Sequence, residues 1–229
     1  LQEVFRKYLG DKSFYVAIAI ALVAPVLMAT QNWDDHTRKG RYIDIEFAKN
    51  LLNTCEENAI LFTGGDNDTF PLWYIQEVEG YRTDVRVVNL ELLISDWYID
   101  QMRSERNGTP GIPVSIDQKE LTGDAGVVIK GFPSLKMQLP LDPIQLVKNG
   151  GFNAQEAGLA DSVMVWDFKA RGRAENPYIL RKDLIIMDVV KNVAADGWKR
   201  PIYFANNMQT DNYLNLMDFF RVEGLAYRV

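Results

Sequence analysis

The residues best suited to chemistry lie in one short run that places two carboxylates next to two glycines. This run, GGDNDT, consists of Gly64, Gly65, Asp66, Asn67, Asp68 and Thr69. Two carboxylates with one residue between them can ligate a cation or accept hydrogen bonds from sugar hydroxyls. Thr69 and the first backbone amides of the helix can donate hydrogen bonds to an anion or a hydroxyl. A purely structural role is the alternative, because acidic side chains at a helix N-terminus stabilise the helix dipole by ~0.3 to 1 kcal/mol each.

The pattern around these carboxylates completes no known ion-binding or nucleotide-binding motif. Its Asp-x-Asp spacing resembles both the start of a calcium loop and the metal-diphosphate site of nucleotide-sugar transferases. The glycine and the distal glutamate of a calcium loop are missing, and neither G-x-x-x-x-G-K-[ST] nor G-x-G-x-x-G occurs. The cofactor is therefore left open, with a divalent cation on Asp66 and Asp68 as the candidate.

The elements around GGDNDT place it at the end of a buried strand. Residues 59–63 are a short apolar run bounded by turn residues, which is typical of a strand. Helical spacing follows as far as Gly80, with residues 66–69 as candidate caps and Pro71 as a first-turn proline. Residues 85–90 have the composition of the next strand. Together these segments predict a β-α-β unit.

Polar residues at the ends of other predicted strands are expected to join GGDNDT at one rim. In an open parallel sheet the ligand crevice lies outside the carboxyl ends of the strands. Asn89 ends the strand 85–90, and Asn206 and Asn207 follow the apolar run 201–205. The predicted ligand-binding residues are therefore Gly64, Gly65, Asp66, Asn67, Asp68, Thr69, Asn89 and Asn206.

The remaining chain alternates predicted helices and strands. Helices are expected near residues 44–56, 95–102, 183–196 and 211–220, and strands near residues 126–130, 162–168, 201–205 and 224–229. Residues 105–152 contain five prolines and predict either an insertion on the sheet or a small irregular subdomain, long enough to cover the crevice. Residues 169–176 form a basic loop in which Arg171 and Arg173 can meet an anion. The fold class is α/β: a Rossmann-like, mostly parallel sheet with helices on both faces.

An apolar segment near the N-terminus predicts a membrane-spanning helix. Residues 14–29 are almost wholly apolar, and residues 13–33 carry no charged side chain, close to the ~20 residues that a spanning helix needs. Basic residues before this segment place the N-terminal flank in the cytoplasm. We expect residues 1–30 to be the span with its flank, and residues 31–229 to be an extracytoplasmic α/β domain. An uncleaved signal-like anchor and a buried core helix are the alternatives.

A second candidate metal site directly follows the apolar segment. Asp34, Asp35 and His36 are residue types that bind hard cations or zinc. Adjacent residues rarely converge on one ion without ligands from elsewhere in the chain. Residues 31–41 are polar and are expected to form a juxtamembrane loop. The alternative to a metal site is that these residues are a capping and turn segment before the helix expected near residues 44–56.

The composition excludes one class of partner and gives the single thiol a structural role. The formal net charge is -6 at pH 7, and no run of Lys or Arg exceeds two residues, so a nucleic-acid partner is not expected. Cys55 is the one cysteine and cannot form an internal disulfide. It is expected to pack as a small apolar side chain.

Several runs of this sequence resemble the soluble region of a family of bacterial multi-pass membrane proteins. That family is related to the animal transmembrane protein O-mannosyltransferases, which are glycosyltransferases of the polyprenyl-sugar-using GT-C type. The runs are NWDDHTRKGRY, NAILFTGGDNDTFPLWYIQEVEGYRTDVRVVNLELL, DWYIDQM, KRPIYFA and EGLAYRV. They cover nearly the whole chain after the apolar segment.

The resemblance implies a glycosyltransferase whose catalytic carboxylate lies in an early extracytoplasmic loop of a multi-span membrane core. No residue of this chain matches that acid. The chain begins without methionine and is expected to be a fragment that holds the last span and the domain after it. Its implied place is the bacterial inner membrane, with residues 13–33 in the lipid bilayer and the α/β domain in the periplasm.

The expected function is that of an accessory domain beside the membrane core of its own full-length protein. It would bind a glycan or an acceptor protein at the GGDNDT rim. The alternatives are a structural or assembly domain without a small-molecule site, and an independent Rossmann-like, metal-dependent enzyme. Exposed aromatic faces near Asp66 would favour sugar binding, whereas burial of Trp73 and Trp97 would favour the structural role.

Overall fold

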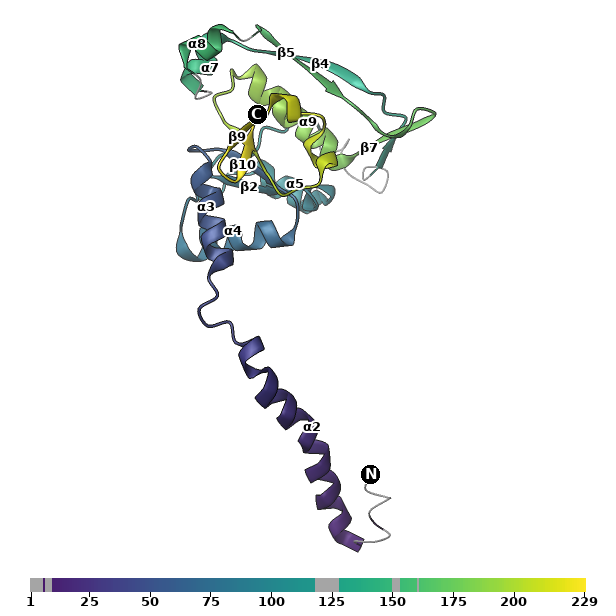
Figure 1. The fold of residues 1–229 in the computed structure, drawn as a ribbon. Helices are drawn as coiled ribbons and strands as arrows, with labels where there is room; N and C mark the ends of the chain where they lie inside the picture. Colours follow the sequence, from purple (N-terminus) through teal and green to yellow (C-terminus); the bar gives the residue numbers. More distant parts are fainter. Residues whose placement is uncertain (1–5, 7–9, 118–127, 150–152, 160) are drawn as a thin grey trace. The chain divides into compact units, whose positions relative to one another are not determined.

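The computed structural model describes residues 6, 10–117, 128–149, 153–159 and 161–229, which fall into two units, Leu1–Tyr42 and Ile43–Val229 (Figure 1). The helices are η1 (Gly10–Lys12), α2 (Ser13–His36), α3 (Ile43–Thr54), α4 (Asp66–Glu79), η2 (Leu92–Ile94), α5 (Asp96–Arg103), α7 (Pro143–Asn149), α8 (Ala154–Gly158), α9 (Arg181–Ala195), η4 (Thr210–Tyr213) and η5 (Met217–Phe219). The strands are β1 (Ile60–Thr63), β2 (Arg86–Asn89), β3 (Val128–Lys130), β4 (Leu135–Pro140), β5 (Val163–Phe168), β6 (Arg171–Arg173), β7 (Asn176–Leu180), β8 (Ile202–Ala205), β9 (Arg221–Glu223) and β10 (Ala226–Arg228).

The first unit is dominated by the apolar helix α2. This helix is long and apolar enough to cross a membrane, and nearly all of its apolar part is exposed. Its length and composition fit a membrane anchor and also a signal sequence. The helix continues to His36, so the expected polar loop 31–41 is wrong for its first six residues. The loop begins only at Thr37, which donates its backbone N–H to the helical carbonyls of Trp33 and Asp34.

The second unit is built on a mixed five-stranded sheet in the order β2-β1-β8-β10-β9. β2, β1 and β8 are parallel, as the β-α-β reading predicts, and Thr63 of β1 pairs with Asn89 of β2. The remaining two strands, β10 and β9, are antiparallel to their neighbours, and the two small sheets are antiparallel as well. The expected mostly parallel sheet is therefore a mixed sheet. The expected last strand at residues 224–229 is thus one arm of a hairpin, which turns at Gly224 with a φ of 51°.

Helices cover both faces of this sheet because successive strand residues point to opposite sides. Leu61 of β1 and Val87 of β2 belong to a core cluster that includes residues of α3 and α4. The neighbouring residues Phe62 and Val88 belong to a second cluster with α5 and α9. The apolar residues of α9 that recur at helical spacing are all buried: Ile186, Val189, Val190, Val193 and Ala194.

Two regions differ from the expected elements. The predicted insertion contains a regular strand, β4, which pairs along its whole length with β5; its residues 118–127 and 150–152 lie outside the described part. The expected helix 211–220 is replaced by the short turns η4 and η5, because Leu214 and Asn215 between them have left-handed backbones with φ of 50° and 62°. The Leu214 carbonyl accepts a hydrogen bond of 2.7 Å from the buried indole of Trp166, which holds this conformation.

Candidate functional site

The structure brings the predicted strand-end residues to one edge of the sheet. β1, β2 and β8 run parallel, so their carboxyl ends meet at the same side. GGDNDT follows β1, Asn89 ends β2, and Asn206 and Asn207 follow β8. A hydrogen bond of 2.6 Å from Nδ2 of Asn207 to Oδ1 of Asp68 joins two of these segments directly. We call this edge the strand-end rim.

Part of the rim is a buried hydrogen-bond network. The hydroxyls of Thr63 and Thr69 lie 2.7 Å apart, and Nδ2 of Asn89 donates to Thr69 Oγ1 at 2.9 Å. Thr69 Oγ1 also donates to the Gly65 carbonyl at 2.7 Å. Its single hydrogen and both lone pairs are thereby used. Oδ1 of Asn89 accepts hydrogen bonds from the backbone amides of Glu91 and Leu92.

The glycines of the run have distinct roles in this arrangement. Gly64 packs closely against the side chain of Met208. A Cβ atom at this position would come 2.9 Å from Cγ of Met208. Gly65 has an extended backbone and precedes the first residue of α4, Asp66. The acidic residues therefore lie inside the first helical turn rather than before it, and Pro71 lies in the second turn instead of the first.

Three side chains of the run remain open to solvent to different degrees. Asp66 and Asn67 are exposed, and Asp68 is half-buried against Asn207.

Within the described ranges no group of three His, Cys, Asp or Glu side chains could hold a metal ion. Asp34, Asp35 and His36 lie exposed in the last turn of α2, in the other unit of the chain.

An aromatic surface adjoins the open carboxylates. Asp66, Phe70 and Tyr74 are four residues apart on α4 and therefore share one side of the helix. Phe70 is 51% exposed and Tyr74 is 47% exposed, whereas Trp73 is half-buried. On α5, Trp97 is 60% exposed. The four-residue spacing from Asp66 is the sequence signal that places Phe70 and Tyr74 on its side of the helix.

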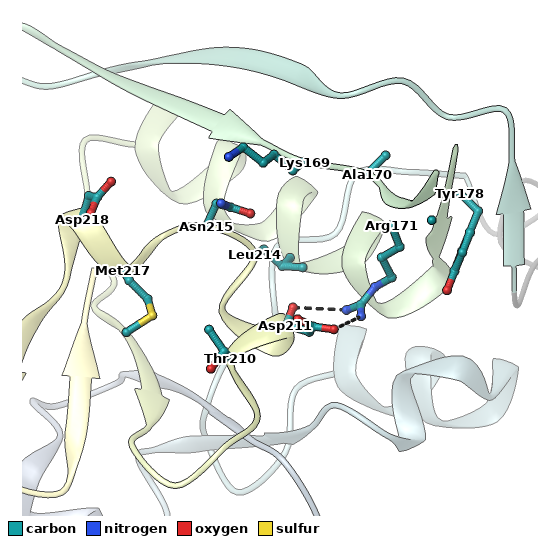
Figure 2. Close-up of a pocket in the computed structure, with 11 residues that line it drawn as sticks. Lys169, Ala170, Arg171, Tyr178, Thr210, Asp211, Leu214, Asn215, Met217 and Asp218 are labelled. Atoms are coloured by element: carbon teal, nitrogen blue, oxygen red, sulfur yellow. Dashed lines mark hydrogen bonds and ion pairs between the residues drawn. The ribbon is translucent and has the colours of Figure 1, made fainter. Parts of the chain in front are cut away.

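A cavity of about 490 Å³ is lined by residues of η4, the turn that follows the rim segment after β8 (Figure 2). Figure 2 shows Arg171 pointing to Asp211, with Lys169, Asn215 and Asp218 around the rest of the opening. The cavity is lined by both positive and negative side chains. No sequence motif marks it, because its residues come from the β5–β6 connection, β6, β7 and residues 210–218.

Arg171 in this cavity is committed to carboxylates of the chain itself. Its Nε donates to Asp183 Oδ2 at 2.7 Å and its Nη2 donates to Oδ1 at 3.0 Å. Its Nη1 also reaches Asp211 at 3.4 Å. The hydrogen bonds that Arg171 donates to the Asp183 carboxylate raise the pKa of Arg171. The expectation that this arginine meets an external anion is therefore not supported by its contacts.

These observations define a mixed α/β domain with an open strand-end rim, preceded by one apolar helix. The chain belongs to the TMEM260-associated domain 2 family, whose model matches residues 44–131 and 121–229. It is 33% identical over 85 residues to the protein O-mannosyl-transferase TMEM260 of Mus musculus; the match covers 35% of this chain and 12% of the mouse protein. No solved structure matches the chain. The family membership confirms the resemblance drawn from the sequence.

Proposed function

We propose that this chain is an extracytoplasmic accessory domain of a membrane glycosyltransferase of the O-mannosyltransferase type, and that it binds a glycan or the acceptor protein. The family and the mouse relative support the association with such an enzyme. The match covers only 12% of that relative, so we assign no step of the transfer reaction to a residue of this chain. Helix α2 would anchor the domain in the bacterial inner membrane, on the periplasmic side.

The observation that carries this proposal is the exposed side of α4. The carboxylate of Asp66 can accept hydrogen bonds from hydroxyl groups, and the rings of Phe70 and Tyr74 offer apolar faces one and two turns further on. A sugar combines hydroxyl groups with an apolar C–H face, so one surface with both features suits it. Asn67 and Asp68 lie in the same helical turn as Asp66 and extend the polar part.

The structural alternative is favoured by a different observation. Thr63, Thr69 and Asn89 are fully buried and bond to one another, so this part of the rim stabilises the fold. An assembly domain would need the network and would not need the open face of α4. The two functions therefore make different predictions for substitutions at Asp66 and at Thr69.

The test is a calorimetric titration of the full chain in detergent with mannose-containing oligosaccharides and with a peptide rich in Ser and Thr. We expect Asp66→Asn and Tyr74→Ala each to weaken binding at least tenfold. Val222→Ala is the matched control, because Val222 is 68% exposed on β9 and lies outside helix α4. Absence of binding by the unsubstituted chain, or equal binding by all variants, would favour the assembly domain.

A further inference from the structure

A cavity of about 320 Å³ opens between α4 and α5 beside the first residues of β2, which lie near one another in Figure 1. This volume is within the range of sites for small molecules. Trp73 of α4 and Trp97 of α5 both line it, and their rings pack against Tyr98 with centroids at 6.5 Å and 5.5 Å. The cavity therefore has indole walls held by one buried aromatic side chain.

The cavity also reaches a buried guanidinium with an unused donor. Arg86, the first residue of β2, is 5% exposed and lines the cavity. Its Nη2 donates to the carbonyls of Gln101 and Ser104 at the end of α5, at 2.6 Å and 2.9 Å. Its Nε is buried and has no hydrogen-bond partner in the described part of the chain. Leaving a buried donor of a charged group unpaired costs free energy, so an acceptor bound to this N–H would stabilise the site.

The charges near this donor favour an acceptor that is negative. Arg106 and Glu77 line the same cavity and form an ion pair of 3.1 Å, so the one lining carboxylate is already used. Burial lowers the pKa of Arg86, and burial together with the charge of Arg86 lowers the pKa of Arg200 to about 10. In the described ranges no carboxylate lies within ion-pair distance of Arg86 or Arg200.

We propose that this cavity between α4 and α5 binds a single pyranose residue that carries an anionic group, either a carboxylate or a phosphate. The C–H face of the ring rests on the indoles of Trp73 and Trp97. The anionic oxygen accepts the hydrogen bond from Nε of Arg86. None of Asp66, Phe70 and Tyr74 lines this cavity, so its lining differs from the surface in the proposed function.

The experiment titrates the full chain in detergent with methyl glucuronide, mannose 6-phosphate, methyl mannoside and inorganic phosphate, followed by indole fluorescence and calorimetry. We expect at least one of the two charged sugars to bind at least tenfold more tightly than the neutral sugar or phosphate alone. The two charged probes distinguish a carboxylate ligand from a phosphate ligand. Equal binding of methyl mannoside or of inorganic phosphate, or no binding at all, overturns the proposal.

Substitutions test whether the charged sugar binds in this cavity. Trp97→Ala should lower the affinity for the charged sugar tenfold or more, and its exposed position leaves the fold intact. Trp33→Ala is the matched control, because Trp33 is 77% exposed on α2 and outside the cavity. Unchanged affinity in Trp97→Ala contradicts the assignment. Asp66→Asn and Tyr74→Ala should leave this binding unchanged, so that failure of either proposal is visible separately.

The role of the guanidinium is tested by Arg86→Lys, which keeps the charge but removes Nε. We expect weaker binding of the charged sugar and unchanged binding of the neutral one. Because Arg86 also holds the end of α5, a second variant is needed if this one does not fold. Arg106→Gln removes a half-exposed positive charge from the same cavity and should also weaken binding of the charged sugar. Equal affinity in whichever variant folds contradicts the anionic requirement.

Discussion

The hydroxyl of Thr69 lies 2.7 Å from the hydroxyl of Thr63 and joins the first turn of α4 to the last residue of β1. Asn89 adds the end of β2 to the same contact. Three elements that are separate in sequence thus meet at one buried oxygen. The GGDNDT run has two parts as a result: Thr69 serves the fold, and the side chains of Asp66 and Asn67 remain free for a ligand.

The Thr69→Val variant should unfold more easily than the unsubstituted chain. Valine keeps the shape but removes the hydroxyl, which leaves Thr63 and the amide of Asn89 without their partner in a buried place. We expect a loss of about 1 to 3 kcal/mol in the free energy of unfolding. Urea denaturation measures it, and the control Thr210→Val, at an exposed position in η4, should change stability by less than about 0.5 kcal/mol.

The two adjacent glycines should respond differently to alanine. Gly64→Ala places a methyl group 2.9 Å from Cγ of Met208, so one of them must move, at a cost of about 1 to 3 kcal/mol. Gly65→Ala meets no atom within 4 Å and is the matched control. In a Met208→Ala background the cost of Gly64→Ala should fall. Equal melting temperatures for the two single variants would contradict the close approach of Met208.

The two carboxylates that share Arg171 should differ strongly in their effect on stability. The Asp183 side chain is 1% exposed and also accepts from the Leu180 backbone amide at 3.0 Å, whereas the Asp211 side chain is 81% exposed. Asp183→Asn should cost about 3 kcal/mol, because it removes one partner of a buried ion pair. Asp211→Asn should stay within about 0.5 kcal/mol. Thermal unfolding of both variants measures the difference, and similar losses would contradict the burial of Asp183.

Cys55 should be unreactive while the domain is folded. Burial raises the pKa of its thiol to about 12, and the side chain is 3% exposed. A thiol-disulfide reagent at about pH 8 should therefore modify it only after denaturant is added, because the thiolate is the reacting form. Since the folded pKa is the higher one, its contribution to stability is complete below about pH 9 and is lost as the pH rises toward 12. Fast modification of the folded chain would contradict this burial.

The sequence was sufficient for the parts of the fold that have a strong local pattern. The apolar runs of β1, β2 and β8 predicted the place and direction of these strands, and the helix expected near residues 183–196 is α9. The edge that gathers Asp68, Asn89 and Asn207 follows from parallel strands alone.

Long-range contacts explain what the sequence did not show. The expected helix 211–220 fails because the Trp166 indole bonds to the Leu214 carbonyl, a contact across 48 residues. The commitment of Thr69 and Asn89 depends on partners in other elements, so their residue types alone suggested ligand binding. The cavities are lined from several segments and have no spacing that a single stretch could reveal.

The central claim is that the exposed side of α4 binds a glycan or acceptor. Its most direct test is a map of backbone amide shifts in the full chain, recorded with and without a saturating mannose-containing oligosaccharide or the Ser- and Thr-rich peptide. We predict that the largest changes fall within residues 66–74 and disappear in Asp66→Asn. Changes confined to the cavity of Figure 2, or no changes with either ligand, would contradict the claim.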